Sequence, residues 1–258
     1  KAKSNGFKTK VLTISTNFPE PITKKRLDIS LKESTKAHKI LKVDESVYFN
    51  IPTLTLSKQN VPNLTLRISK EISNFKPDIV IIPFPDRHQD HKIVFDLGMT
   101  VTRPKGVAKD IKIVACMEIP SATYYSAPSI EPNFYPNWNI DISKTIKQKA
   151  NALTKYKTTL SKSESARSTK SIYSLASFRG SQVNLNYAES FYIVRMQSKE
   201  KIFWTLKINY KINLCSFASP DLKRSAIRVI DQAKRINLYN RIKVFSVDDL
   251  NTQEKNFL

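Results

Sequence analysis

Short runs of apolar residues alternate along the chain with longer segments in which apolar residues recur at helical spacing. The short runs predict strands at 11–15, 46–50, 79–82, 111–117 and 190–195. The helical spacing predicts helices at 24–42, 64–75, 91–102, 141–159 and 168–177. Because strands that alternate with helices form mainly parallel sheets covered on both faces, we expect a Rossmann-like three-layer α/β/α fold.

The alternation restarts after Met196. A strand at 208–217, a helix at 220–236 and a strand at 242–247 would form one βαβ-like unit. Two interpretations remain open for it: the opening of a second α/β domain, or a C-terminal extension that completes the first sheet. We therefore predict a first domain at 1–197 and a separate C-terminal unit at 198–258.

The chain is strongly basic, with 43 Lys and Arg against 22 Asp and Glu and a formal net charge of +21. The lysines are spread among Asn, Ile and Ser instead of forming one dense tract, and no nucleic-acid-binding motif accompanies them, so we expect no nucleic-acid partner. An anionic substrate remains compatible with the charge, and so does association with a membrane surface. No apolar run approaches the roughly 20 residues needed to span a bilayer, and we expect a soluble protein.

The two cysteines, Cys116 and Cys215, form neither a CxxC pair nor a disulfide framework. This usage suits a reducing compartment and predicts a cytoplasmic location. Cys116 lies within the apolar run at 111–117, which favours a small core residue over a nucleophile.

Candidate chemistry is concentrated after the predicted strand at 79–82, where the chain reads PFPDRHQDH over residues 83–91. His88 and His91 bracket Asp90 at a junction between a loop and a helix. Ligand sites in such sheets lie at the carboxyl ends of the strands, and neutral imidazole is a preferred zinc ligand. A neighbouring carboxylate can orient one ring. The alternative is a helix N-terminus with Asp90 opposite the helix dipole and two incidental surface histidines.

These residues alone do not complete a zinc site. Catalytic zinc usually takes about three protein ligands and a water molecule, whereas this segment offers one or two. The third histidine of the chain, His38, lies in the predicted helix at 24–42 and is better explained as a solvated residue.

Three segments, in order, resemble motifs of the PIG-L/LmbE family of zinc-dependent N-acetylglucosaminyl deacetylases. The first is the segment at 83–91, preceded by KPDIVIIP. The second is NIDIS at 139–143, followed by Lys149. The third is RGS at 179–181, followed by AESF at 188–191. The resemblance covers about residues 5–196 and implies hydrolysis of an acetamide on a sugar conjugate.

Carried over residue by residue, the resemblance implies that His91 is a Zn²⁺ ligand. It also implies that His88 stabilises the oxyanion or protonates the departing amine, and that Asp90 holds the ring of His88. Water activated by the metal would attack the acetamide carbonyl and release acetate and a free amine.

Substrate contacts are expected around this centre. Asp86 and Arg87 would lie at its rim, where a sugar could meet them. Tyr125 and Trp138 could stack on a pyranose face, or pack their Pro-rich loop as structural residues. A further pair, Arg179 and Glu189, is expected to be structural, with a place in the pocket wall as the alternative.

The family's other signature, His-Pro-Asp-Asp after the first strand, does not occur in the chain. Residues 1–16 resemble the stretch that follows that signature, which favours an N-terminally truncated enzyme over an inactive homologue. We therefore expect the chain by itself to be nearly inactive. The alternative function is a non-catalytic sugar-binding or scaffold domain of a larger carbohydrate-biosynthesis protein. A faint likeness of the segment after residue 208 to capsular-type glycosyltransferases raises a fusion as a variant.

Overall fold

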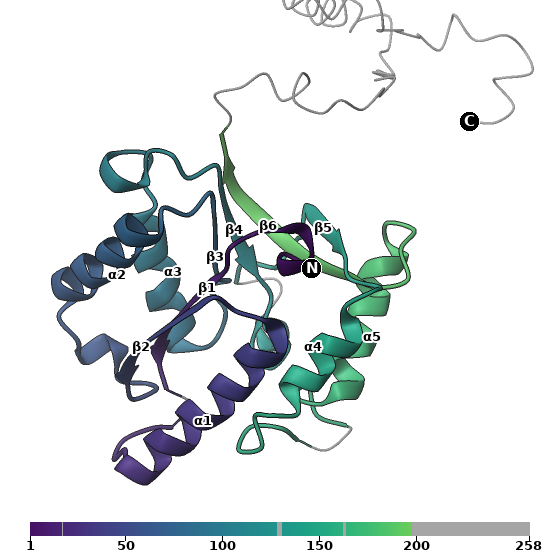
Figure 1. Cartoon of the computed structure of the whole chain (residues 1–258), viewed down its shortest axis with the longest axis horizontal. Coiled ribbons are helices and arrows are strands. Elements are labelled where there is room, and N and C mark those ends of the chain that lie inside the picture. The colour runs from purple at the N-terminus through teal and green to yellow at the C-terminus, as the bar shows by residue number, and fades with distance from the viewer. Residues whose placement is uncertain (17, 128–130, 162–163, 198–258) are drawn as a thin grey trace, which may run out of the picture. The chain divides into compact units, whose positions relative to one another are not determined.

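A computed structural model describes residues 1–16, 18–127, 131–161 and 164–197 (Figure 1). Its strands are β1 (Lys10–Ser15), β2 (Glu45–Ile51), β3 (Ile79–Pro83), β4 (Ile113–Met117), β5 (Trp138–Asp141) and β6 (Ala188–Met196). Its α-helices are α1 (Lys24–Leu41), α2 (Val61–Phe75), α3 (Gln89–Val101), α4 (Ile146–Leu153) and α5 (Thr169–Ser181). Short 3₁₀ turns include η4 (Thr123–Tyr125). The predicted α/β class is confirmed.

The described strands form two sheets. β1 and β2 pair in parallel, and the second sheet has the order β3-β4-β6-β5. Within it, β3 and β4 are parallel, whereas β6 is antiparallel to both of its neighbours. The expected parallel arrangement thus holds for β1–β2 and β3–β4, and the second sheet is mixed.

The direction of β6 follows from the connection that precedes it. The last residue of β5, Asp141, pairs with the first residue of β6, Ala188. Two helices, α4 and α5, lie between these strands and contact each other. An even number of helices returns the chain to the end of the sheet from which it left, so β6 runs back along β5. The sequence periodicity did not reveal this pairing.

One predicted helix is a strand, a turn and a shorter helix in the structure. The segment 141–159 contributes its first residue to β5 and is helical only at α4. The carboxylate of Asp141 accepts hydrogen bonds from the backbone N–H of Ser143 at 2.9 Å and from its hydroxyl at 2.6 Å. Such a local turn competes with helix formation, which explains why α4 begins five residues later than expected.

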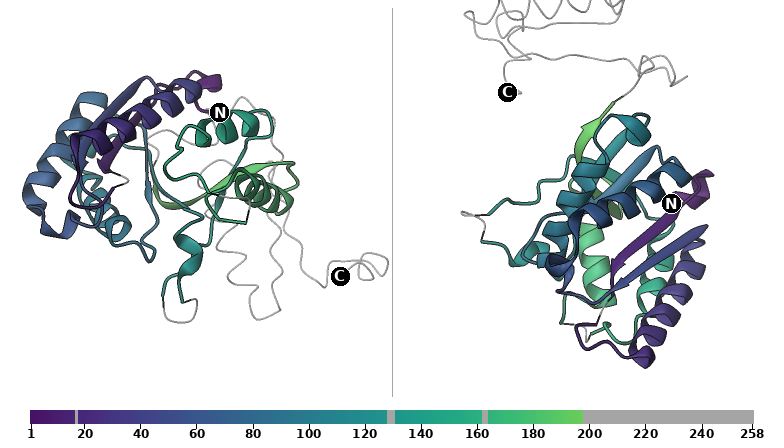
Figure 2. Two further views of the ribbon diagram at one scale, coloured as in Figure 1. Left: turned by 90° about the horizontal axis from the view of Figure 1, so that it is seen from below. Right: turned by 90° about the vertical axis from the view of Figure 1, so that its left-hand side faces the viewer.

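The helices pack in pairs around the sheets: α1 lies against α4, and α2 lies against α3 (Figures 1 and 2). The main core joins strand and helix residues, including Ile14, Ile51, Leu64, Ile68, Ile82, Leu97 and Val114. Helix α3 approaches β3 closely at Gly98, where a Cβ atom would lie 2.8 Å from Cγ2 of Ile82. This close contact fixes the height of α3, and with it the start of the helix, relative to the carboxyl end of β3.

Lys1–Ser198 form one compact unit. The predicted strands and helix at 208–247 lie outside the described residues. Among the described helices, none combines the length and apolar character that a bilayer span requires.

Candidate functional site

The loop between β3 and α3 is organised by the buried carboxylate of Asp86, which is only 2% exposed. Its Oδ1 atom accepts hydrogen bonds from the backbone N–H of His88 at 2.9 Å and from Nδ1 of His91 at 2.8 Å. Its Oδ2 atom accepts a hydrogen bond from the hydroxyl of Thr123 at 3.0 Å. Burial is the largest single influence and favours the neutral carboxyl, but hydrogen bonds from His91, from the backbone of His88 and from Thr123 together lower the pKa of Asp86. Asp86 is therefore an internal anchor and does not lie at the rim as expected.

Asp86 determines which nitrogen of His91 carries a proton. Because the ionised carboxylate only accepts hydrogen bonds, Nδ1 of His91 must be the donor in their 2.8 Å contact. In neutral His91 the lone pair is then on Nε2. The side chain is partly exposed. A ring held by a carboxylate at one nitrogen, with a lone pair at the other, is the usual arrangement of a metal-ligating histidine.

His88 has the opposite proton arrangement. It is the N-cap of α3, and its Nδ1 atom accepts a hydrogen bond from the backbone N–H of Asp90 at 3.2 Å. Neutral His88 therefore carries its proton on Nε2. Burial is the main cause that lowers the pKa of His88, and the charges of His91 and Arg167 add to it. The ring is thus neutral near pH 7 and presents an N–H donor.

The two imidazoles lie side by side. Their centroids are 4.5 Å apart and their planes differ by 22°. The rings thus stack on the same side of the loop at the carboxyl end of β3, as the sequence predicts. His91 thus has a lone pair on Nε2, and the neighbouring ring of His88 has an N–H donor on Nε2.

Asp90 has different partners from those expected. Its Oδ2 atom accepts hydrogen bonds from the hydroxyl of Thr53 at 3.0 Å and the backbone N–H of Leu54 at 3.1 Å. Its Oδ1 atom is buried and has no hydrogen-bond partner among the described residues. Asp90 contacts His88 through its backbone and not its carboxylate. Its carboxylate thus joins the first turn of α3 to the loop after β2. A carboxylate in the first turn of a helix also interacts favourably with the helix dipole.

Arg87 lies on the exposed side of the loop and forms an ion pair with Glu131 at 2.9 Å. Beside it is a hollow of about 330 Å³, whose lining includes Asp86, Lys92, Phe95 and Glu131. A larger hollow of about 700 Å³ lies along α1 and includes none of the predicted site residues. The smaller hollow is the better candidate for substrate because it adjoins Asp86.

The two predicted stacking residues differ in their surroundings. Tyr125 is 68% exposed and lies in η4, two residues after Thr123. Trp138 packs against Phe191 at a centroid distance of 5.4 Å. Strand register connects Pro83 to Trp138 through Met117 and Phe191. This register places Trp138 at the same edge of the sheet as the histidine loop but three strands away, about 14 Å at ordinary strand spacing.

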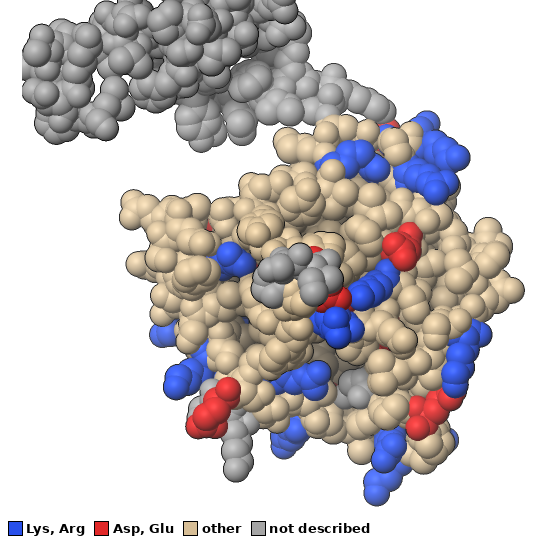
Figure 3. Space-filling model, turned by 180° about the vertical axis from the view of Figure 1, so that it is seen from behind, with Lys and Arg blue, Asp and Glu red and all other residues tan. Residues whose placement is uncertain are grey.

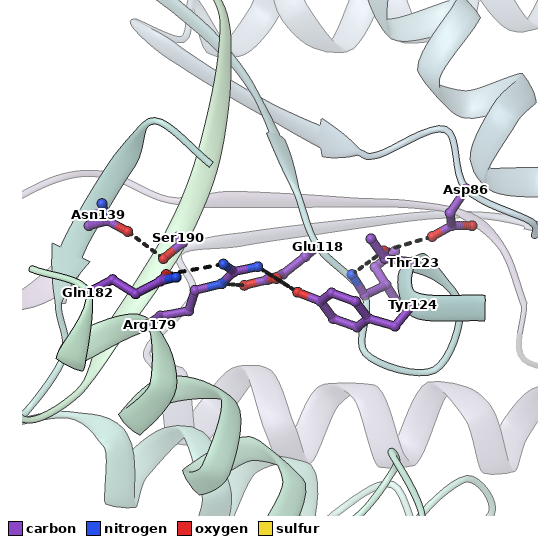
Figure 4. A network of polar contacts seen from close by, with 9 residues as sticks. Asp86, Glu118, Thr123, Tyr124, Asn139, Arg179, Gln182 and Ser190 are labelled. Carbon is purple, nitrogen blue, oxygen red and sulfur yellow. Dashed lines mark hydrogen bonds and ion pairs between the residues drawn. The ribbon is translucent and has the colours of Figure 1, made fainter. Parts of the chain in front are cut away.

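A polar network that the sequence did not predict lies beside this loop (Figure 4). Arg179 binds both carboxylate oxygens of Glu118, at 2.7 and 3.1 Å, and donates to the hydroxyl of Tyr124 at 2.7 Å. The pairing expected for Glu189 is replaced by an ion pair with Lys149 at 2.6 Å. A charged residue directly after the buried run at 111–117 was the available signal for Glu118, because such a position demands a partner.

Among the described residues, one side chain is oriented as a metal ligand. The orientation of His91 suits a ligand, and the described part of the chain contains no group of three or more His, Cys, Asp or Glu side chains arranged to hold a metal. His91 can therefore contribute to a zinc site, but the described residues do not supply a whole coordination shell.

The fold and the paired histidines define an α/β protein with a polar site at the carboxyl ends of β3 and β4. The family described as "PIG-L: GlcNAc-PI de-N-acetylase" matches residues 2–102. The resemblance to PIG-L/LmbE proteins is confirmed over these residues. No curated protein sequence matches the chain.

Solved structures share the fold at low sequence identity. A conserved protein of Thermus thermophilus is 20% identical, with a TM-score of 0.60 over 78% of this chain and 88% of that one. N,N'-diacetylchitobiose deacetylase of Pyrococcus horikoshii is 17% identical, with a TM-score of 0.57 over 74% of each chain. The zinc-inhibited form of teicoplanin deacetylase is 14% identical, with a TM-score of 0.57 over 77% of this chain and 91% of that one.

Proposed function

We propose that this protein removes the acetyl group from an N-acetylglucosamine-type sugar conjugate by hydrolysing the amide bond. The family match supports this activity, as do deacetylases among the structures with the same fold. The observation that carries the proposal is the hydrogen bonding of two stacked imidazoles: Nδ1 of His91 faces the carboxylate of Asp86, whereas Nδ1 of His88 faces the backbone N–H of Asp90.

The two rings suit different tasks in amide hydrolysis. We propose Zn²⁺ as the cofactor, with the Nε2 lone pair of His91 as one of its ligands. Zinc supplies, when bound, a water molecule with a lowered pKa. The Nε2–H of His88 can donate to the carbonyl oxygen as negative charge develops on it. Protonation of the departing amine, which otherwise leaves poorly as an anion, would first require His88 to take up a second proton and become an imidazolium.

Substrate binding is proposed for the hollow beside the loop. Arg87 and Glu131 provide charged groups for sugar hydroxyls, and the exposed ring of Tyr125 is available for stacking. Trp138 could reach only a longer conjugate, because about three strand spacings separate it from the histidine loop. The lysine-rich surface fits an anionic conjugate or an anionic membrane surface. We also propose a cytoplasmic location.

The second candidate function is a non-catalytic sugar-binding or scaffold domain. The incomplete set of metal ligands among the described residues favours it. Under this alternative, purified protein would bind N-acetylated sugars without releasing acetate. We also expect residues 1–258 alone to be nearly inactive, because a single well-defined ligand does not hold zinc in a fixed geometry.

Histidine replacements in the protein expressed from its complete reading frame test the proposal. His91→Ala should abolish both zinc binding and acetate release from an N-acetylglucosaminide. His88→Ala should retain zinc and slow turnover by roughly 10²- to 10⁴-fold, the range for lost acid–base or oxyanion assistance. His38→Ala is the matched control, since His38 lies on α1 and binds Ser46. Loss of zinc from His88→Ala with retention in His91→Ala would reverse the roles, and unchanged activity in both would exclude this chemistry.

A further inference from the structure

Thr123 is placed to control the carboxylate that holds His91. Its hydroxyl accepts a hydrogen bond from the backbone N–H of Ile119 at 2.8 Å and donates to Oδ2 of Asp86 at 3.0 Å. Because the N–H of Ile119 occupies the hydroxyl oxygen as an acceptor, the hydroxyl proton is directed toward Asp86. Thr123 is 5% exposed and Asp86 is 2% exposed, so water does not readily replace this contact.

Each oxygen of Asp86 thus has its own task. Oδ1 receives Nδ1 of His91 and the backbone of His88, while Oδ2 receives the hydroxyl of Thr123. Leaving a buried carboxylate oxygen without a hydrogen-bond donor has a high free-energy cost. The carboxylate would recover by turning toward another donor, and that rotation withdraws Oδ1 from His91.

Residues on both sides of Thr123 in sequence, Glu118 and Tyr124, belong to a polar clamp centred on the buried side chain of Arg179. Glu118 follows the last residue of β4, and Tyr124 follows Thr123 directly. Arg179, which projects from α5, binds both (Figure 4). Tyr124 also donates to the carboxylate of Glu118, which closes the triangle.

The clamp has the properties of a rigid support. The side chains of Arg179 and Glu118 are each 8% exposed, and their contact is bidentate. A planar guanidinium fork gives such a contact a defined direction. Arg179 also lies near the rings of Phe134 and Phe178, at 5.7 and 5.6 Å from their centroids. A fourth hydrogen bond links Arg179 to Gln182, the C-cap residue of α5, at 3.2 Å.

We propose that Thr123 is a positioning residue that fixes the proton of His91 on Nδ1 through Asp86, and that the Arg179–Glu118 clamp holds Thr123 in place. Figure 4 shows the two parts of this connection meeting at Thr123 and Tyr124. The inference deepens the proposed function, on which the metal-ligand role of His91 rests. The ring state itself exists without metal and can be measured without turnover.

The test is the ¹⁵N NMR signature of the histidine rings in metal-free protein treated with EDTA. The chain has three histidines, so six ring nitrogens must be assigned, with His91→Gln and His88→Gln identifying their own signals. Unaltered protein should show His91 with Nδ1 protonated and Nε2 unprotonated. Thr123→Val, which keeps the shape and removes the hydroxyl, should raise the ratio of the Nε2–H to the Nδ1–H tautomer by about three- to tenfold.

Two matched variants separate positioning from general stability. Thr123→Ser retains the hydroxyl and should restore the ring signature of unaltered protein. Thr102→Val removes another fully buried hydroxyl, which donates to the carbonyl of Gly98 at 2.8 Å near the far end of α3. It should lower the melting temperature without changing the His91 signals. If Thr123→Val does not fold, Thr123→Ala is assessed by the same criteria.

A substitution in the clamp tests its contribution to the tautomer ratio of His91. Glu118→Gln preserves size but weakens the charge-assisted contact with Arg179, and should shift the His91 ratio in the same direction as Thr123→Val. An unchanged tautomer ratio in Thr123→Val, or an equal shift in Thr102→Val, would overturn the inference. Absence of acetate release from the unaltered full-length protein would instead contradict the proposed function and would leave the ring measurement intact.

Discussion

The atom that faces Nδ1 determines which ring nitrogen is protonated in each of the two neighbouring histidines. A carboxylate faces His91 and a backbone N–H faces His88. The sequence motif identified both rings and the Asp residues beside them, but the identity of the orienting carboxylate was wrong. Asp86 is five residues from His91 and only the folded loop brings them together, whereas adjacency in sequence favoured Asp90. Sequence spacing predicts which side chains lie close together, but it does not predict which atoms form hydrogen bonds with each other.

The buried histidine on α1 should make the protein sensitive to mild acid. Burial lowers the pKa of His38, which is 9% exposed and bonds to Ser46 through Nδ1 at 2.7 Å. As the pH falls below about 6.5, the unfolded chain binds a proton at this residue before the folded chain does, so the free energy of unfolding decreases. Urea denaturation at several pH values between 7.5 and 5 should show this decrease.

His38→Gln should reduce the pH slope, because glutamine does not titrate. Some slope should remain, since burial also lowers the pKa of His88. A slope that is identical in His38→Gln and in unaltered protein would contradict the assignment to His38.

The buried thiol of Cys116 should be chemically inert in the folded state. Burial raises its pKa to about 12, and the side chain is 1% exposed on the central strand β4. Because the thiolate is the reactive form, alkylation by iodoacetamide at pH 8 should be slow until urea unfolds the protein. Peptide mass spectrometry distinguishes Cys116 from Cys215. Rapid modification of Cys116 under native conditions would show that β4 opens readily.

At the level of elements, apolar spacing predicted the helices, and the capping residues seen in the structure fix where they begin. Asn60 caps α2, Ser168 caps α5, and Gly6 adopts a left-handed φ of 81° after the short turn at Lys3–Asn5. The four-residue strand β5 gave no such signal, because it is too short for alternation to show and its neighbour β6 lies about fifty residues away. Long-range pairing made it a strand, and local periodicity had assigned its last residue to a helix.

Gly98 shows a case in which packing should override helix propensity. Alanine at an exposed helix position is favoured over glycine by about 1 kcal/mol. At Gly98, however, the added Cβ atom would lie 2.8 Å from Ile82, which forces α3 away from β3. Gly98→Ala should therefore lower the melting temperature, even though alanine is the better helix former. The same displacement should disturb the His88 and His91 ring signals.

Thr100→Ala is the control within the same helix, because Thr100 is exposed. It should leave the melting temperature unchanged or slightly higher. A rise in melting temperature for Gly98→Ala would show that Ile82 adjusts freely and that the contact does not set the position of α3.

For the whole molecule, the sequence predicted the histidine loop of the candidate site but not the residues that hold the loop in place. The histidine loop is one continuous segment, so a motif could reveal it. Thr123 lies 37 positions from Asp86, and Arg179 lies 61 positions from Glu118. Residues that meet only through β4, η4 and α5 leave no pattern in a single sequence. The charge of the chain is likewise visible in its composition, but its distribution requires the structure.

The net charge of +21 predicts a dependence of stability on salt. Lys and Arg are scattered among neutral residues on the surface in Figure 3, with fewer acidic groups between them. On α1, Lys32, Lys36 and Lys39 follow one another at helical spacing, and none forms an ion pair with a described residue. Like charges so placed repel each other more in the folded chain than in the expanded one. Raising NaCl from 0.05 to 0.5 M should therefore increase the free energy of unfolding measured in urea.

Lys36→Glu tests whether this repulsion is local. The replacement turns repulsion with Lys32 and Lys39 into attraction, each pair changing stability by roughly 0.2–0.5 kcal/mol. The variant should be more stable than unaltered protein at 0.05 M NaCl, and its advantage should shrink at 0.5 M because salt screens exposed charges. Lys36→Gln should show a smaller gain, since it removes repulsion without adding attraction. If salt stabilises all three proteins by the same amount, the repulsion is spread over the whole surface and the lysines of α1 have no special share in it.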